Sequence, residues 1–121
     1  MPITGGGTCI IYRVAGHNVS ALHVMYDVDG YHGDTASSNN PTTAQKILGV
    51  VISGTSVGGV APIVRQGEYD DPTNSLTPGP LFLGVSGELQ SVPPASGVLV
   101  RIGFASSTSK AIIDVQEAIN L

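Results

Sequence analysis

Short apolar runs recur along the chain, and Gly, Pro, Asn or Asp ends each of them. The clearest alternation of apolar and polar residues lies at 19–29, where Val24 and Tyr26 fall on one face and Met25 on the other. Alternation with a period of two residues is typical of a strand whose two faces meet different surroundings. The segment 19–29 therefore predicts the first well-defined strand.

A turn and a returning strand are expected directly after this segment. Asp29-Gly30 is a strong signal for a tight turn between two strands. The residues at 31–36 then supply the returning strand, and the polar residues at 37–43 a loop.

Two apolar runs follow the loop. The run at 46–53 is almost continuously apolar and rich in β-branched residues, which predicts a strand buried on both faces rather than a helix. The run at 60–66 predicts another strand. Pro62 favours an edge position or a bulge for it, because proline cannot donate a hydrogen bond to a neighbouring strand. A long polar loop is expected at 68–79.

The next segment predicts a hairpin. Two short apolar runs, at 81–85 and 89–92, flank the turn residues Ser86 and Gly87. Beyond the hairpin, the run at 98–104 predicts a strand with four apolar residues on one face. These residues are Val98, Val100, Ile102 and Phe104.

The pattern as a whole predicts an all-β fold. A last strand is expected at 110–116 and a short tail at 117–121. Several short strands at even spacing, without a helical stretch, are typical of a small antiparallel sandwich or barrel, jelly-roll-like in form. The order of the strands stays open. We expect one β domain at 15–121, preceded at 1–14 by a flexible N-terminal arm or a first strand.

Composition adds that the surface is poor in charge. Of the 121 residues, 41% are hydrophobic and 12% are charged, against roughly a quarter charged in ordinary soluble domains. Either Ser, Thr and Asn coat the surface, or partner proteins cover much of it. Aromatic residues make up only 5% and Trp is absent, so the core is expected to consist of aliphatic side chains.

Charge and length argue against several classes of partner. The net charge is −4 and the five Lys and Arg residues are scattered along the sequence, so no basic stripe is available for nucleic acid. No apolar run reaches the roughly 20 residues of a membrane-spanning helix. The single cysteine, Cys9, excludes an internal disulfide, and we expect it to be a buried small apolar residue.

Four stretches of the chain read LHVMYDVDGYHGDTASSNN, AQKILGVVISGTSVGG, PGPLFLGVSGELQSVPPASG and VRIGFASSTSKAIIDVQ. In this order they resemble a small β module of tailed bacteriophages, found in capsid decoration (cement) proteins, head fibres and tail fibres. The resemblance covers about seven-eighths of the chain, from Ala15 onwards, and rests on turn and packing positions. Among these, Gly103 within a strand indicates a bulge or a close approach of two backbones.

The resemblance implies a virion protein on the outer surface of the capsid. Such a protein would bridge neighbouring copies of the major capsid protein and would itself form a homodimer or homotrimer. The alternative is the tip of a short head fibre or tail fibre that contacts the host cell. Fibre proteins usually carry a long stalk, and none is recognisable here, which favours the decoration role.

Few residues are candidates for catalysis or metal binding. His23 and His32 flank the Asp29-Gly30 turn, but the spacing of a calcium loop fails at the positions that require Gly and Glu. Adjacent acidic residues, Asp70 and Asp71, are more typical of a loop than of paired catalytic carboxylates. No Gly-x-Ser-x-Gly elbow is present. The sequence therefore predicts no enzyme, no metal site and no cofactor.

The N-terminal segment is the one candidate for a partner contact. An arm containing Ile3 and Thr4, followed by an apolar patch, could add a strand to the sheet edge of a neighbour. The alternative is that the apolar patch is simply the first strand of the domain. The patch consists of Cys9, Ile10, Ile11 and Tyr12.

Overall fold

The structure, a computed structural model, describes residues 8–71 and 75–121. In this part of the chain it contains eleven strands and one short helix, α1 (Pro41–Ala44). The strands are β1 (Cys9–Ala15), β2 (Val24–Asp27), β3 (His32–Thr35), β4 (Ile47–Val51), β5 (Val60–Asp70), β6 (Gly79–Leu83), β7 (Leu89–Gln90), β8 (Val98–Leu99), β9 (Arg101–Ala105), β10 (Lys110–Asp114) and β11 (Ile119–Asn120). The predicted all-β class is confirmed.

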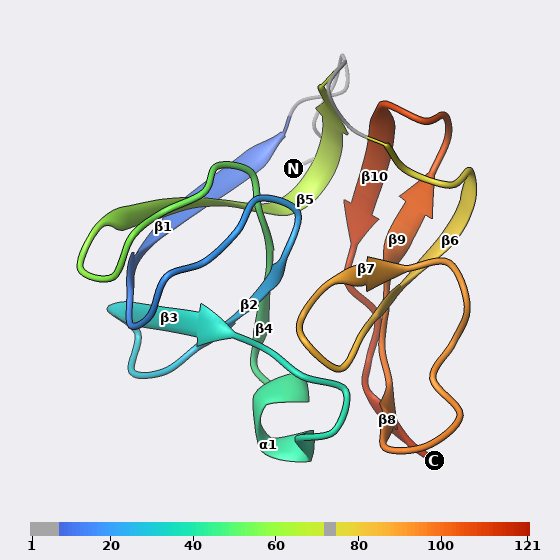
Figure 1. Ribbon diagram of the computed structural model, residues 1–121, viewed down its shortest axis with the longest axis horizontal. Helices are drawn as coiled ribbons and strands as arrows, with labels where there is room; N and C mark the ends of the chain where they lie inside the picture. Colours follow the sequence, from blue (N-terminus) through green and yellow to red (C-terminus); the bar gives the residue numbers. More distant parts are fainter. Residues whose placement is uncertain (1–7, 72–74) are drawn as a thin grey trace.

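The first five strands close into a small barrel. Their order is β1-β3-β2-β4-β5, and β5 pairs back with β1 (Figure 1). The β1–β3 pair is parallel and the other pairs in the barrel are antiparallel. Of the two forms that the sequence left open, a sandwich or a barrel, these five strands form a barrel, with one parallel pair that the pattern did not predict.

Strand β5 connects the barrel to a second group of strands. Its first half, including Val60 and Ile63, pairs with β1 and β4, and its second half, from Gln66 to Asp70, pairs with β10. Beyond β10 the sheet continues through β9, β6 and β7. In Figure 1 this group lies beside the barrel, and β8 and β11 form a separate two-stranded sheet.

The strands of the barrel enclose one core and share a second. Met25, Leu48 and Ile63 belong to one cluster of buried side chains, while Val24 and Val50 belong to a larger cluster shared with β6, β9 and β10. Because β2 lies between the two clusters, its consecutive residues Val24 and Met25 are both fully buried. The alternation at 19–29 thus separates two cores and does not separate core from solvent.

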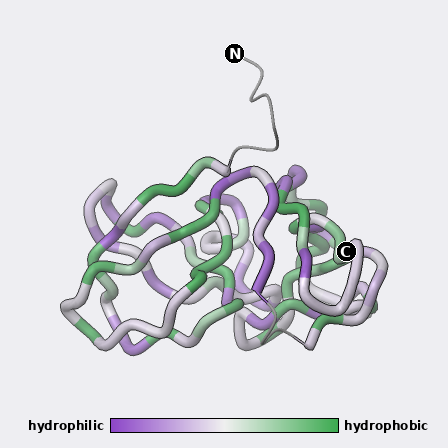
Figure 2. The backbone as a smooth tube through the Cα atoms, turned by 90° about the horizontal axis from the view of Figure 1, so that it is seen from above, coloured by the Kyte–Doolittle hydropathy of each residue, from purple (hydrophilic) through white to green (hydrophobic). Residues whose placement is uncertain are grey.

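Hydropathy follows this arrangement. Hydrophobic and hydrophilic stretches alternate over short distances along the tube in Figure 2. The run at 46–53 does not alternate in this way, and in β4 the residues from Leu48 to Val51 are all buried. Its prediction as a strand buried on both faces is confirmed. The β2–β3 and β6–β7 hairpins are confirmed as well.

Strand β5 differs from the prediction in two ways. Pro62 lies in the middle of the sheet and not at an edge. It pairs with Tyr12 of β1 on one side, and on the other side its carbonyl accepts a hydrogen bond from the backbone N–H of Ile52. The strand also continues through Asp70, so the polar loop expected at 68–79 begins later. Pairing with β10 holds these polar residues in extended form.

Strand β9 contains the irregularity that Gly103 indicated. Leu81 pairs with Gly103 and Phe82 with Arg101, so Ile102 is an extra residue in β9. A bulge of this kind reverses the faces of the residues beyond it. Phe104 is accordingly 41% exposed, and the expectation that it shares the buried face of Val98, Val100 and Ile102 is wrong.

Two shorter segments were also missed. The loop expected at 37–43 ends in one turn of helix, α1, whose start is capped by the Asn40 side chain through the backbone N–H of Thr42. The tail at 117–121 contains β11, which pairs with β8. Both are too short to leave a periodic signal in the sequence.

Candidate partner-binding surface

Strand β1 presents an aromatic residue on the outside of the barrel. Ile11 and Ala15 pack with the inner cluster of the barrel. Tyr12 directly follows Ile11 and therefore lies on the opposite face of the strand, where it is 61% exposed. Tyr12 pairs with Pro62 of β5, and β3 pairs with the end of β1, at Val14 and Ala15.

Closure of the barrel brings two further exposed side chains beside Tyr12. The backbone N–H of Val14 donates to the carbonyl of Tyr31, 3.0 Å away, and Val14 pairs with Val60 of β5. Tyr31 is 67% exposed and Val60 61%. With Val14 and Gly30, and bordered by Arg13, they line a shallow cleft of about 190 Å³. We call this cleft, around Tyr12, Tyr31 and Val60, the aromatic cleft.

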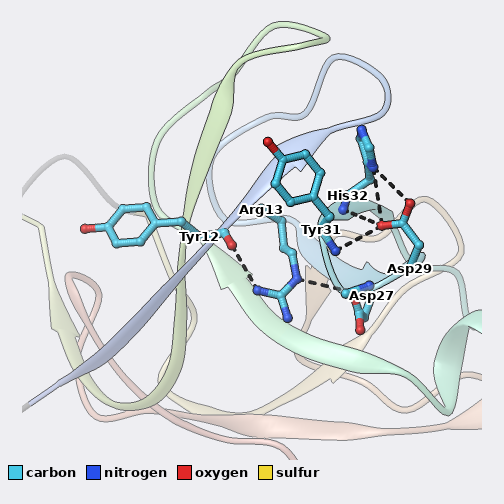
Figure 3. A network of polar contacts seen from close by, with 7 residues as sticks. Tyr12, Arg13, Asp27, Asp29, Tyr31 and His32 are labelled. Atoms are coloured by element: carbon cyan, nitrogen blue, oxygen red, sulfur yellow. Dashed lines mark hydrogen bonds and ion pairs between the residues drawn. The ribbon is translucent and has the colours of Figure 1, made fainter.

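The turn that carries Tyr31 is held by a carboxylate (Figure 3). Asp29 accepts hydrogen bonds from the backbone N–H groups of His32, at 2.7 Å, and Tyr31, at 3.0 Å, and from the His32 ring at 3.0 Å. The backbone bond from His32, followed by that from Tyr31, lowers the pKa of Asp29 from 3.8 to about 2. Gly30 adopts φ +81° in this turn. The Tyr31 ring meets His32 edge to face, 5.1 Å between centroids.

Arg13 connects this turn to β1. Its Nε lies 3.2 Å from Oδ1 of Asp27, and its Nη1 donates to the carbonyl of Tyr12 at 2.9 Å. The same Asp27 oxygen accepts the backbone N–H of Gly30 at 2.8 Å. Two groups of hydrogen bonds therefore lie beside the aromatic cleft, one around Arg13 and Asp27 and one around Asp29, as Figure 3 shows.

A second cleft, of about 470 Å³, lies on the other side of Arg13. Its lining includes Lys46, just before β4, and Arg65 of β5, together with Arg13, Asp27 and Asp29. We call it the basic cleft. It collects three of the five Lys and Arg residues of the chain, although these residues are far apart in the sequence.

The histidines pair with neighbours and do not converge. Nδ1 of His17 lies 2.5 Å from Oδ2 of Asp34, and Nδ1 of His32 lies 3.0 Å from Oδ2 of Asp29. Nδ1 of His23 lies 3.3 Å from the carbonyl of Ala21. Among residues 8–71 and 75–121, no group of three His, Cys, Asp or Glu side chains could hold a metal ion.

The adjacent acidic residues have different neighbours. Asp70 is the last residue of β5, and in the strand register it lies opposite Lys110 of β10. Asp71 accepts a hydrogen bond from the Tyr69 hydroxyl at 3.1 Å. Partial burial, and then the contact with Asp71, raise the pKa of Tyr69. These contacts tie the end of β5 to the loop that follows it.

The N-terminal candidates are partly placed. Cys9, Ile10, Ile11 and Tyr12 lie in β1, paired with β5 of the same chain. Cys9 is exposed, and so the expectation of a buried cysteine is wrong. Ile3 and Thr4 lie outside the described residues. The boundary expected between residues 14 and 15 falls inside β1, which runs to Ala15.

Comparison with known proteins assigns no family. No family model matches the chain, and the search of curated proteins finds no significant relative. In the described part of the chain, no helix is long and apolar enough to cross a membrane.

Proposed function

We propose that this chain is a non-enzymatic structural protein of a tailed-phage virion, which decorates the outer surface of the capsid. It would bind neighbouring copies of the major capsid protein and so stabilise the shell. The observation that supports this most is the aromatic cleft, an exposed group of Tyr12, Tyr31 and Val60 on a closed barrel. The resemblance to phage decoration modules supplies the identity of the partner.

The cleft has properties that favour protein binding. Aromatic side chains are enriched at interface cores, where they bury a large area at little cost in side-chain entropy. Tyr12 and Tyr31 are two of the four tyrosines of the chain, and both are more than half exposed. The hydrogen bonds of Asp29 and Arg13 hold their backbones in place before any partner arrives, which lowers the cost of binding.

Assembly would multiply these contacts. A homodimer or homotrimer that engages several capsid proteins at once converts modest single contacts into strong overall binding. A chain in which only 12% of the residues are charged suits this role, because charged residues are depleted at interface cores. The proposal assigns no catalytic step, cofactor or nucleic acid.

The test is binding to capsids assembled without this protein. Replacement of both cleft tyrosines, in Tyr12→Ala with Tyr31→Ala, should weaken co-sedimentation with the capsids by about thirtyfold or more, as expected for central aromatic anchors. The matched control is Phe104→Ala, which removes a 41% exposed aromatic from β9 in the other group of strands and should leave binding unchanged.

Two results would contradict the proposal. Failure of the wild-type protein to bind capsids, with adhesion to host cells instead, would favour the fibre-tip alternative. Equal loss of binding in the tyrosine variant and in Phe104→Ala would show that the aromatic cleft is not the contact. Circular dichroism of each variant verifies that the fold is retained.

A further inference from the structure

The basic cleft contains two cations, Lys46 and Arg65, that form no ion pair in the part of the chain that the structure describes. Lys110 lies 3.1 Å from Glu68, and Arg13 is paired with Asp27. Among residues 8–71 and 75–121, no ion pair involves Lys46 or Arg65. Both side chains are exposed. The chain as a whole has a net charge of −4, whereas positively charged side chains gather at this cleft.

The fold explains why the two cations meet. Strands β4 and β5 are paired in the barrel. Lys46 stands just before β4. Arg65 of β5 is the extra residue of a bulge, because Cys9 pairs with Gln66 and Ile10 with Val64. Pairing of the two strands thus brings Lys46 and Arg65 to the lining of the same cleft.

The basic cleft and the aromatic cleft are adjacent. Arg13 and Gly30 line both of them, and the Arg13 guanidinium is fixed by Asp27 and by the carbonyl of Tyr12. A ligand that crosses Arg13 would meet Tyr12 and Tyr31 on one side and unpaired cations on the other.

We propose that the two clefts form one groove for an acidic segment of a partner protein. The segment would be extended, would place an apolar side chain on the aromatic cleft, and would place a nearby Asp or Glu carboxylate between Lys46 and Arg65. This inference rests on the proposed function, because it describes the part of the partner that the aromatic cleft contacts.

The charges in the groove favour a carboxylate over a nucleic acid. Asp27 and Asp29 line the same cleft as the two unpaired cations. A phosphate backbone brings many negative charges along its whole length, and these two carboxylates would repel it. A peptide can supply one or two carboxylates opposite the cations while its remaining atoms are neutral.

The probe is a synthetic peptide, acetyl-Glu-Glu-Gly-Pro-Leu-Gly-amide, together with the same peptide in reversed order. Titration followed by amide NMR shifts, up to about 10 mM peptide since single short segments bind weakly, should perturb residues of both clefts. The version with Gln in place of Glu should bind at least about fivefold more weakly, because it lacks the charge. Added salt, at about 0.5 M, should reduce the difference.

Variants of the two cations test whether the basic cleft binds the carboxylates of the peptide. Lys46→Gln with Arg65→Gln should reduce binding of the acidic peptide to that of the neutral one. The control Arg101→Gln removes a cation from β9 and should change nothing. Absence of shifts with both acidic peptides, equal binding of the neutral version, or equal perturbation by inorganic phosphate would each overturn the proposal.

This experiment and the capsid experiment fail independently. If capsids bind the wild-type protein and the Lys46→Gln, Arg65→Gln variant equally well, the decoration function stands, and the proposal that the partner contributes an acidic segment is wrong. If capsids do not bind the wild-type protein, the decoration function fails, and the peptide titration still decides whether the groove takes acidic segments.

Discussion

Single polar residues fix the shape of the aromatic cleft. Asp29 accepts the backbone N–H groups of Tyr31 and His32, and Asp27 is shared between Arg13 and Gly30. Neither role can be recognised from composition, because a carboxylate in a turn of this kind looks like an ordinary solvated residue. The contacts nevertheless fix the backbone of the turn that carries Tyr31.

The lowered pKa of Asp29 predicts a pH-dependent contribution to stability. Because its pKa falls from 3.8 to about 2 on folding, the ionised carboxylate stabilises the folded state above about pH 4, and this contribution is lost as the pH falls through about 2. Asp29→Ala should therefore lower the melting temperature near neutral pH, and the difference from wild type should shrink as the pH falls from about 4 to about 2.

Thermal melts at several pH values measure this effect. The control is Asp114→Ala, which removes an exposed carboxylate at the end of β10. A difference between wild type and Asp29→Ala that stays constant from neutral pH to about pH 2 would contradict the role assigned to the Asp29 charge.

At the scale of elements, the backbones of β9 and β10 approach each other closely. A methyl group at Gly103 would overlap the carbonyl oxygen of Ile112. Gly103→Ala should therefore cost about 2–4 kcal/mol in the free energy of unfolding, because two paired strands must separate to accommodate it. Gly54→Ala is the matched control, since its new methyl group meets only the Val19 carbonyl at an ordinary 3.8 Å.

Urea denaturation provides the measurement for both glycine variants. A Gly54→Ala protein within about 0.5 kcal/mol of wild type is the expected baseline for an uncrowded site. If Gly103→Ala were as stable as this control, the close packing of β9 on β10 would be contradicted.

The strands could be predicted from the sequence only where the local signal matched the burial. The run at 46–53 was assigned correctly because a barrel strand packed between two cores is apolar on both faces. Phe104 was assigned wrongly because the extra residue Ile102 reverses the alternation, and a bulge leaves no mark other than Gly103. The pairing of β1 with β3 is parallel and joins segments that are distant in the sequence, so it cannot be predicted from a local pattern of apolar and polar residues.

The candidate surface was visible only in part. Tyr12 was selected from the sequence because it lies in an apolar patch near the N-terminus. Tyr31 and Val60 were not, since each is an isolated residue beside a turn or at the start of a strand. The basic cleft was missed for the same reason: Lys46 and Arg65 are scattered in sequence and meet only after barrel closure.

At the scale of the whole molecule, β5 makes the two cores interdependent. Ile63 of β5 lies in the inner cluster of the barrel, whereas Val64, the next residue, lies in the larger cluster with Ile102. Unfolding of one group of strands would expose the side chains that the other group buries along this strand. We therefore expect a single cooperative transition.

Two core variants test this cooperativity. Ile63→Ala and Ile102→Ala each remove a fully buried side chain, one from each cluster, and each should cost about 2–5 kcal/mol. In differential scanning calorimetry both variants should shift one common transition, with calorimetric and van't Hoff enthalpies in agreement. Two separated transitions in either variant would show that the barrel and the second group of strands unfold independently.

The decoration role predicts that binding sites on the capsid are fixed in number and that their occupation strengthens the shell. The most direct measurement adds increasing amounts of purified protein to capsids assembled without it, and records the bound copies and the temperature at which the capsids rupture. We expect saturable binding, with a rupture temperature that rises until saturation. Binding without saturation, or saturation without any rise in rupture temperature, would contradict it.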